Sequence, residues 1–190
     1  PARALVRKLN ESGQNAVYTK QPTDGEIGKF IREILAGEKK FEPLAFQYLF
    51  VADRVGHQKE ILEYLADGKI VVSDRYFWSS VAYGGTDRGI DFSKKNGDVL
   101  LSAFGILSAY HQFLAPDITI YLDAKVDTAF ARLAKERHER EIYDEREKLE
   151  NIAKGYDWLV GKFPQEFVII DGAKPVEEVS KEIIDNINKL

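Results

Sequence analysis

The residues Asp74, Arg75 and Tyr76 place an acid, a cation and a phenol side by side, directly after the apolar run 70–73. A carboxylate can hold metal-linked water, and an arginine fork can take a phosphate through two hydrogen bonds, so the pair suits phosphoryl transfer. The alternative is a strand-end salt bridge that precedes a capped helix. Taken alone, the tripeptide favours the salt bridge. The residues around it favour a site for phosphoryl transfer.

A second combination is formed by Phe50 and Arg54, which stand four residues apart and therefore share one face of a helix over this segment. The ring can stack on a nucleobase, which is worth about 1 to 3 kcal/mol in single-strand binders, and the guanidinium can donate to a carbonyl edge. The alternative is a core phenylalanine beside a surface arginine that is paired with Asp53 or Glu60.

The elements that must position these residues alternate along the chain. Short apolar runs predict buried strands at 16–19, 70–73, 118–122 and 167–170. Apolar residues at three-to-four spacing predict helices at 2–12, 27–35, 44–66, 99–113, 126–137, 145–163 and 176–190. Gly13 is suited to end the first helix and Pro175 to open the last. This alternation predicts an α/β fold, with a parallel sheet flanked by helices, and a single domain over 1–190.

Polar residues follow three of these strands, and Asp123 follows the fourth. The first strand leads into the segment 20–25, and the last leads into Asp171, Gly172, Ala173 and Lys174. In open parallel sheets, ligands bind beyond the carboxyl ends of the strands. The sequence therefore predicts one site at that edge of the sheet.

Composition narrows the classes of function. The 190 residues carry a net charge of −4, which argues against a broad surface for a nucleic acid polymer. The chain has no cysteine, which excludes disulfides and thiolate metal sites, and no apolar run is long enough for a membrane span or a signal peptide. We expect a cytoplasmic protein whose bound nucleotide is small.

The sequence closely resembles the thymidylate (dTMP) kinase family of P-loop nucleoside monophosphate kinases. The resemblance runs from Pro1 to Leu190 and is carried by 49–54, Asp74-Arg75-Tyr76, Ser79-Ser80 and Ala82-Tyr83, in order and at familiar spacing. It implies a three-layer P-loop kinase fold, transfer of a phosphoryl group from ATP to dTMP in dTTP synthesis, Mg²⁺ as cofactor and a homodimer through the helix at 44–66.

The resemblance also assigns roles to residues. It implies that Phe50 stacks on thymine, that Arg54 bonds the base, that Arg75 binds the monophosphate and that Tyr83 disfavours a ribose 2'-hydroxyl. Asp74 is assigned to the magnesium and phosphate region, through water if not directly. Ser79 and Pro22 complete the acceptor-binding set that it implies.

Two further segments extend the resemblance toward ATP. Residues 137–147 resemble a mobile lid in which Arg137 and Arg140 compensate charge on the transferred group, and the alternative is a solvated charged helix. Residues 171–174 resemble a loop that lies against adenine, and the alternative is an ordinary strand-to-helix turn. The residues themselves do not choose between these interpretations.

Three departures from the family's pattern stand out. Lys20-Gln21-Pro22 occupies the place of Arg-Glu-Pro, so a phosphate-contacting arginine is missing there, and Gly84 occupies a place where relatives often carry Gln or Thr. The G-x-x-x-x-G-K-[ST] sequence, which cradles ATP phosphates, does not occur in these 190 residues. In the family this loop and the central strand directly precede the helix that begins here near Ala2. We expect both to exist, upstream or on another chain.

Two other functions stay open at this point. The nearer is a P-loop kinase for another deoxynucleoside or nucleoside monophosphate. The more distant is a noncatalytic nucleotide-binding or assembly subunit that keeps the acceptor pocket without the loop. The activity of these 190 residues by themselves also stays open.

Overall fold

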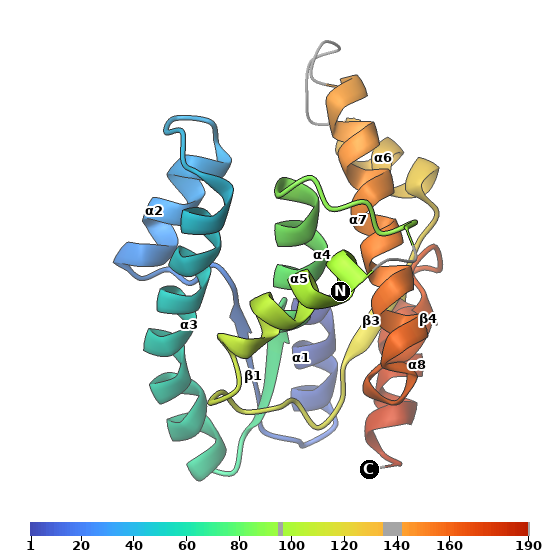
Figure 1. Cartoon of the computed structure of the whole chain (residues 1–190). Helices are drawn as coiled ribbons and strands as arrows, with labels where there is room; N and C mark the ends of the chain where they lie inside the picture. The colour runs from blue at the N-terminus through green and yellow to red at the C-terminus, as the bar shows by residue number, and fades with distance from the viewer. Residues whose placement is uncertain (95–96, 135–141, 190) are drawn as a thin grey trace.

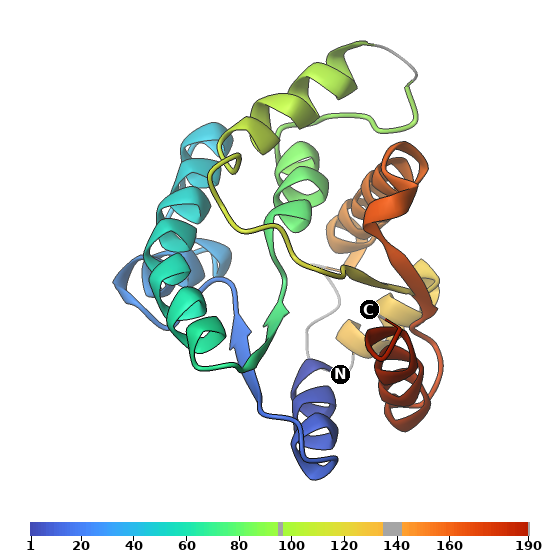
Figure 2. The same ribbon diagram turned by 90° about the horizontal axis from the view of Figure 1, so that it is seen from below.

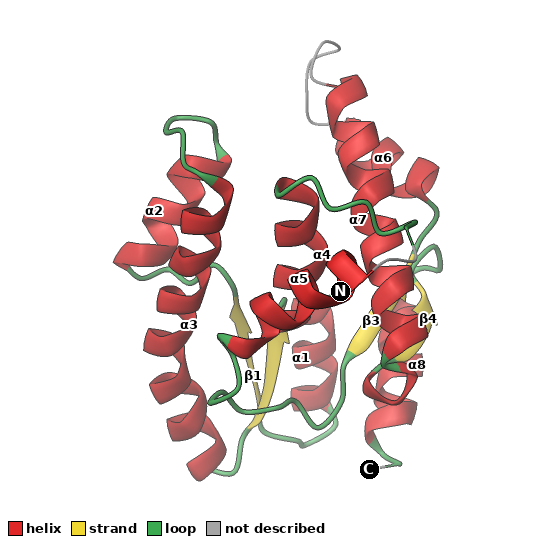
Figure 3. Cartoon of the chain, in the orientation of Figure 1, coloured by secondary structure: helices red, strands yellow, loops and turns green. Residues whose placement is uncertain are grey.

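The computed structural model describes residues 1–94, 97–134 and 142–189, in which helices alternate with short strands (Figure 1). The strands are β1 (Ala16–Lys20), β2 (Ile70–Asp74), β3 (Ile120–Asp123) and β4 (Val168–Asp171). The helices are α1 (Ala2–Glu11), α2 (Glu26–Leu35), α3 (Pro43–Ala66), α4 (Phe77–Asp87), α5 (Gly97–Ser108), α6 (Val126–Ala134), α7 (Ile142–Lys162) and α8 (Val176–Ile187). Figure 3 shows the same alternation by element type. The predicted α/β class is confirmed.

The strands form two small parallel sheets. β1 pairs with β2, from Ala16 opposite Ile70 to Lys20 opposite Asp74, and β3 pairs with β4, from Ile120 opposite Val168 to Asp123 opposite Asp171. Within the described ranges β2 and β3 do not pair with each other. The family resemblance implies a further strand at the centre of the sheet. The division between β2 and β3 is where such a central strand would lie.

Two apolar clusters hold the layers together. One cluster joins α1 and α8 across the sheets, and its buried members are Leu5, Leu9, Ala16, Ile170, Val179 and Ile183. The other lies among α4, α5 and α7 and is built around Trp78, Val81, Phe92 and Leu159. Figure 2 shows α4 between α3 and α7. The second cluster therefore fixes α4, and Val51 of α3 packs against it, which holds together the two helices that carry most of the predicted acceptor residues.

The ends of two helices follow from local chemistry. The Glu42 carboxylate accepts hydrogen bonds from the backbone N–H groups of Leu44 and Ala45, at 2.8 and 3.1 Å, and Pro43 fills the first turn of α3. α1 ends at Glu11, and Gly13 follows with φ of 85°, a conformation in which glycine is not strained. The predicted stop at Gly13 is confirmed.

Several boundaries differ from the prediction, and one helix lies outside the predicted set. α5 ends at Ser108 rather than Phe113, because the chain continues in turns such as the bond from Tyr110 N to Leu107 O. The set of helices predicted from apolar spacing lacks α4, which the sequence offers only as the capped helix of the alternative interpretation, since serine pairs and glycine pairs are weak helix formers. Burial of Trp78, Val81 and Ala82 stabilises α4 regardless of propensity. Among the described helices, none has the length and apolar character needed to cross a membrane.

Candidate functional site

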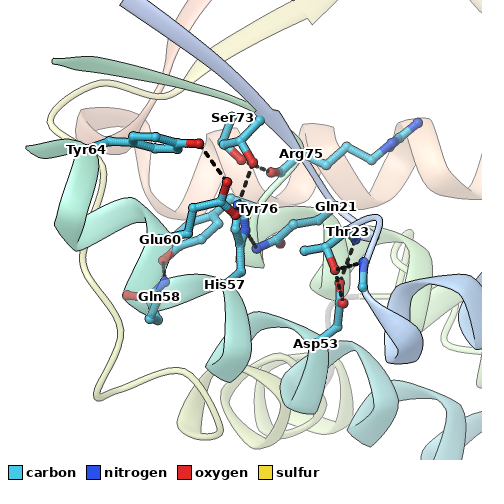
Figure 4. Close-up of polar contacts among 12 residues, drawn as sticks. Gln21, Thr23, Asp53, His57, Gln58, Glu60, Tyr64, Ser73, Arg75 and Tyr76 are labelled. Carbon is cyan, nitrogen blue, oxygen red and sulfur yellow. Dashed lines mark hydrogen bonds and ion pairs between the residues drawn. The ribbon is translucent and has the colours of Figure 1, made fainter.

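Arg75 begins the turn that follows β2, and its backbone adopts a left-handed conformation with φ of 72°. Such a conformation costs a residue with a Cβ on the order of 1 to 3 kcal/mol and is frequent at functional sites. The Ser73 hydroxyl donates to the Arg75 carbonyl oxygen at 2.8 Å and supports the turn. Figure 4 shows the Arg75 side chain pointing away from the polar groups around His57.

Tyrosines surround the Arg75 guanidinium. Its Cζ atom lies 4.6 Å from the centre of the Tyr83 ring, and the Ser79 hydroxyl lies 2.8 Å from the Tyr156 hydroxyl. Tyr156 of α7 stacks on Tyr121 of β3 with ring centres 5.0 Å apart. Burial raises the pKa of both Tyr156 and Tyr121, so these phenols remain neutral donors. The predicted residues Arg75, Ser79 and Tyr83 therefore lie together, in a setting suited to an anionic group.

Arg54 of α3 lies on the other side of the segment 76–83 from Arg75, and its side chain is buried, with only 2% of the residue exposed. Its guanidinium donates to the Gln21 side-chain oxygen, to Ser80 Oγ at 3.1 Å and to the Tyr76 carbonyl oxygen at 3.3 Å. It also lies 4.6 Å from the centre of the Tyr110 ring. Burial lowers its pKa, although an arginine stays charged. The interpretation as a surface arginine is wrong, because Arg54 is buried and forms no ion pair with a described carboxylate.

Asp53 fixes the loop after β1 instead of pairing with Arg54. Its carboxylate accepts from the Thr23 backbone N–H at 2.8 Å and from the Thr23 hydroxyl at 2.5 Å. Arg32 of α2 donates to the carbonyl oxygens of Thr23 and Pro22 at 2.7 and 3.2 Å. The Gln21–Pro22 bond is cis. Arg32 thus brings a guanidinium to the loop in which Lys20 replaces the family's arginine.

Phe50 lies one turn before Arg54 on α3 and is half-buried, with its ring centre 5.0 Å from that of Phe46. Gln47, a further turn back, fills the space beside Gly84 of α4. A Cβ atom on Gly84 would lie 2.4 Å from the Gln47 amide carbon. This contact gives a steric reason for glycine at a position where the family often has a larger residue.

The loop after β4 is held by a bond within its own turn and by bonds to β3 and α8. The Asp171 carboxylate accepts from Ala173 N at 2.8 Å, Gly172 N donates to the Asp123 carbonyl oxygen at 2.6 Å, and the Lys174 ammonium pairs with Glu182 at 2.8 Å. This geometry is that of an ordinary strand-to-helix turn, and it lies apart from the α3–α4 residues. The other predicted donor-side residues, Arg137 and Arg140, lie outside the described residues.

Asp74 is the predicted metal-region residue, and its side chain is exposed at the end of β2. No group of three or more His, Cys, Asp or Glu side chains within the described ranges could hold a metal ion. Mg²⁺ usually keeps several waters and binds one or two carboxylates together with substrate phosphates. A single exposed carboxylate beside an arginine fits that mode of binding.

Sequence reasoning missed several residues of this site. Gln21 and His57 form a buried polar network with Arg54, and Tyr156 lines the Arg75 side from a distant helix. His57 stands three residues after Arg54, so its helical spacing is a signal that could have found it. Tyr156 lies in an amphipathic helix without a motif, and no local signal separates it from core residues.

The comparisons with known proteins agree with this arrangement. The sequence profile of thymidylate kinase matches residues 1–183. A probable thymidylate kinase of Methanococcus maripaludis is 40% identical, over 98% of this chain and 86% of its own length. A thymidylate kinase of Thermoanaerobacter sp. is 34% identical, over 97% and 88%, and one of Leifsonia xyli is 35% identical, over 96% and 84%. With the acceptor motifs brought together and a profile match over most of its length, the chain belongs to the thymidylate kinase family.

Proposed function

We infer that the protein transfers the γ-phosphoryl group of ATP to dTMP and forms dTDP. The observation that carries this inference is the placing of two arginines on the two sides of the segment 76–83. Arg54 touches the segment at Tyr76 and Ser80, and Arg75 lies over Tyr83. One side suits a base and the other suits a phosphate, which is the layout that a nucleoside monophosphate requires.

The acceptor roles of individual residues follow from their surroundings. Arg75, beside neutral phenols, would hold the monophosphate through charge-assisted hydrogen bonds. Phe50 would stack on thymine, and Arg54 would donate to a base carbonyl. Tyr83 would lie against the sugar, where its ring disfavours a 2'-hydroxyl, with Ser79 and Pro22 completing the pocket. Because phosphoryl transfer needs little proton chemistry, positioning and electrostatic stabilisation supply most of the catalysis.

The donor side of the proposal rests more on the family than on geometry. Asp74 would hold Mg²⁺, in part through water, and the ion would link and neutralise phosphate oxygens. Residues 171–174 would lie against adenine, and Arg137 and Arg140 would compensate charge on the transferred group from a lid at 137–147. We propose that a G-x-x-x-x-G-K-[ST] loop outside these 190 residues completes the site.

We further propose a homodimer through α3. Large apolar side chains are exposed along this helix at intervals of three, four or seven residues, which places them on one stripe: Leu44, Tyr48, Val55, Leu62 and Leu65. A contiguous apolar stripe on a surface helix is typical of a protein–protein interface. A cytoplasmic location remains a proposal that rests on the need for ATP.

The direct test is the formation of dTDP from dTMP and Mg-ATP by the full-length protein, measured by chromatography. Parallel reactions with dUMP, dCMP, AMP and the ribose analogue of dTMP separate the rival functions. Preferential conversion of dTMP supports the proposal, and a preference for another acceptor favours a different monophosphate kinase. Absence of any product, with dTMP still bound, would favour the noncatalytic subunit.

A further inference from the structure

A buried chain of hydrogen bonds connects β1 to Arg54 through His57 and Gln21. Figure 4 shows His57 beside Gln21. His57 Nε2 lies 2.5 Å from the Thr19 hydroxyl, and His57 Nδ1 lies 3.2 Å from Gln21 Nε2. The Gln21 side-chain oxygen accepts from Arg54 Nε, and Arg54 Nη1 donates to Ser80. His57 and Gln21 are 3% and 5% exposed, so water cannot easily replace these partners.

The direction of every bond in this chain follows from Arg54. A guanidinium has donors only, so the Gln21 atom that faces it must be the amide oxygen. The Gln21 atom that faces His57 is then the NH₂ group, which is a donor. His57 Nδ1 must therefore be the acceptor, and the single ring proton belongs on Nε2, from which it is donated to Thr19.

Protonation of His57 conflicts with this arrangement. A proton on Nδ1 would face the Gln21 NH₂ group, donor against donor. Rotation of the Gln21 amide by half a turn would satisfy His57, but it would then present NH₂ to the donors of Arg54. The first outcome removes the hydrogen bond that orients the Gln21 amide, and the second removes the hydrogen bond that Gln21 accepts from Arg54. In both cases a buried polar group loses its partner, which is costly.

The charged groups around His57 come mostly from its own helix. Glu60 Oε2 lies 3.8 Å from His57 Nε2, and Glu60 also accepts from the Tyr64 hydroxyl at 2.7 Å. Thr19 of β1 and Gln21, which follows β1, are neutral partners of the ring, and Tyr76, after β2, is a neutral phenol whose pKa burial raises. Burial lowers the pKa of His57 below its usual 6.5; Glu60 and Asp53 oppose this effect and Arg54 adds to it. His57 is thus neutral near pH 7.

We propose that His57 is a positioning residue for the acceptor site: its neutral ring orients the Gln21 amide, and that amide holds Arg54 in the geometry that reads the base. The proposal rests on the proposed function, because it assigns Arg54 to the base of dTMP. It adds a dependence of dTMP recognition on the protonation of a residue that touches no substrate.

Three variants test this relay. His57→Asn keeps an acceptor near the position of Nδ1 but cannot titrate, and His57→Leu removes the acceptor. Gln21→Glu accepts from Arg54 and also from a protonated His57. His111→Asn is the matched control, because His111 is exposed and bonds the Ser108 carbonyl oxygen, at 2.7 Å, rather than a residue of the relay.

The measurement is KM for dTMP, KM for ATP and kcat between about pH 5 and pH 7.5, the range in which a histidine titrates. Each KM is expressed as a ratio to that of His111→Asn, which cancels the titration of the dTMP phosphate itself. We expect His57→Leu to raise KM for dTMP roughly fivefold to tenfold near neutral pH, as the loss of one buried hydrogen bond implies, with little change in KM for ATP.

At acid pH the wild-type KM for dTMP should rise relative to that of His57→Asn, and Gln21→Glu should suppress this rise. Thermal melts of the same variants distinguish a positioning role of His57 from a purely structural one. Since the folded pKa of His57 lies below the unfolded value of 6.5, its contribution to stability is present above that pH and is lost as the pH falls.

If His57→Leu raised KM for both nucleotides equally and in proportion to a lowered melting temperature, the relay would be wrong and His57 would be a packing residue. The relay would also be wrong if the ratio of the wild-type KM for dTMP to that of His111→Asn did not change with pH. These outcomes differ from failure of the proposed function, in which the wild-type protein itself would not phosphorylate dTMP.

Discussion

The carboxyl ends of the two small sheets use their polar side chains in different ways. Beyond β1 and β2 the polar groups cross between elements, as Asp53 holds Thr23 and Arg54 reaches Gln21 and Ser80. Beyond β3 and β4 the Asp171 carboxylate caps its own turn at Ala173 N, and the side-chain link to α8 is an exposed ion pair between Lys174 and Glu182. The β1–β2 end therefore contains buried polar groups, Arg54 above all, beyond those that close a turn. The polar groups at the β3–β4 end serve the turn itself.

The difference indicates which half of the site is built before a ligand arrives. A buried guanidinium without a carboxylate partner is costly, and hydrogen bonds together with the Tyr110 ring offset only part of that cost. A fold retains such a group when it serves a ligand. We therefore propose that the acceptor-binding side chains at the β1–β2 end are preformed, and that the β3–β4 end relies on other parts of the enzyme.

The largest expected effect comes from Arg75→Ala. Loss of the charge-assisted contact to the monophosphate should raise KM for dTMP and lower kcat, for a total of about 1.5 to 3 kcal/mol, or roughly tenfold to 150-fold in kcat/KM. Arg88→Ala, at the exposed end of α4, is the control. If the folded Arg75→Ala variant had unchanged kinetics, Arg75 would not be the residue that binds the monophosphate.

Phe50→Ala tests the other side of the segment. Loss of one base–aromatic stack should weaken dTMP binding by about 1 to 3 kcal/mol and leave ATP affinity nearly unchanged. Calorimetric titration with each nucleotide, beside thermal melts, provides the measurement. Equal losses for both nucleotides that follow the melting temperature would mean that Phe50 is a core residue.

Gly84→Ala tests whether the pocket wall is as tightly packed as the Gln47 contact indicates. The added Cβ would meet the Gln47 amide carbon at 2.4 Å, so overpacking should lower stability by about 1 to 3 kcal/mol. Gln47→Ala should relieve this loss, and a double-mutant cycle in urea measures the coupling. Additive losses from the two substitutions would show that the residues do not press on each other.

Lys174→Ala should have the smallest effect. Its ammonium is already paired with Glu182 on an exposed surface, and such pairs contribute little. We expect KM for ATP and kcat, measured by the formation of dTDP, to change by less than about twofold, because the contact is weak and exposed. A change as large as that of Arg75→Ala would instead make the β3–β4 end a built donor site, and the contrast between the two ends would be lost.

Much of this molecule could be predicted from its sequence. The strands and most helices follow from apolar spacing, and Arg75, Ser79 and Tyr83 could be placed together because they follow one strand closely. Apolar spacing does not predict α4, which enters only as an alternative interpretation, since its stability comes from burial of Trp78 and Val81 rather than from helix propensity. The relay of Gln21 and His57 and the contribution of Tyr156 were also beyond prediction, because they depend on contacts between residues far apart in sequence.

The most direct test of the preformed acceptor pocket is a calorimetric titration of dTMP into the full-length protein in the absence of ATP. We predict saturable binding of dTMP that Phe50→Ala and Arg75→Ala each weaken by about tenfold or more, as loss of one stack or one charge-assisted contact implies. Thermal melts of both variants should remain close to that of the wild-type protein. Binding that appears only after ATP is added, or that neither substitution changes, would contradict the account.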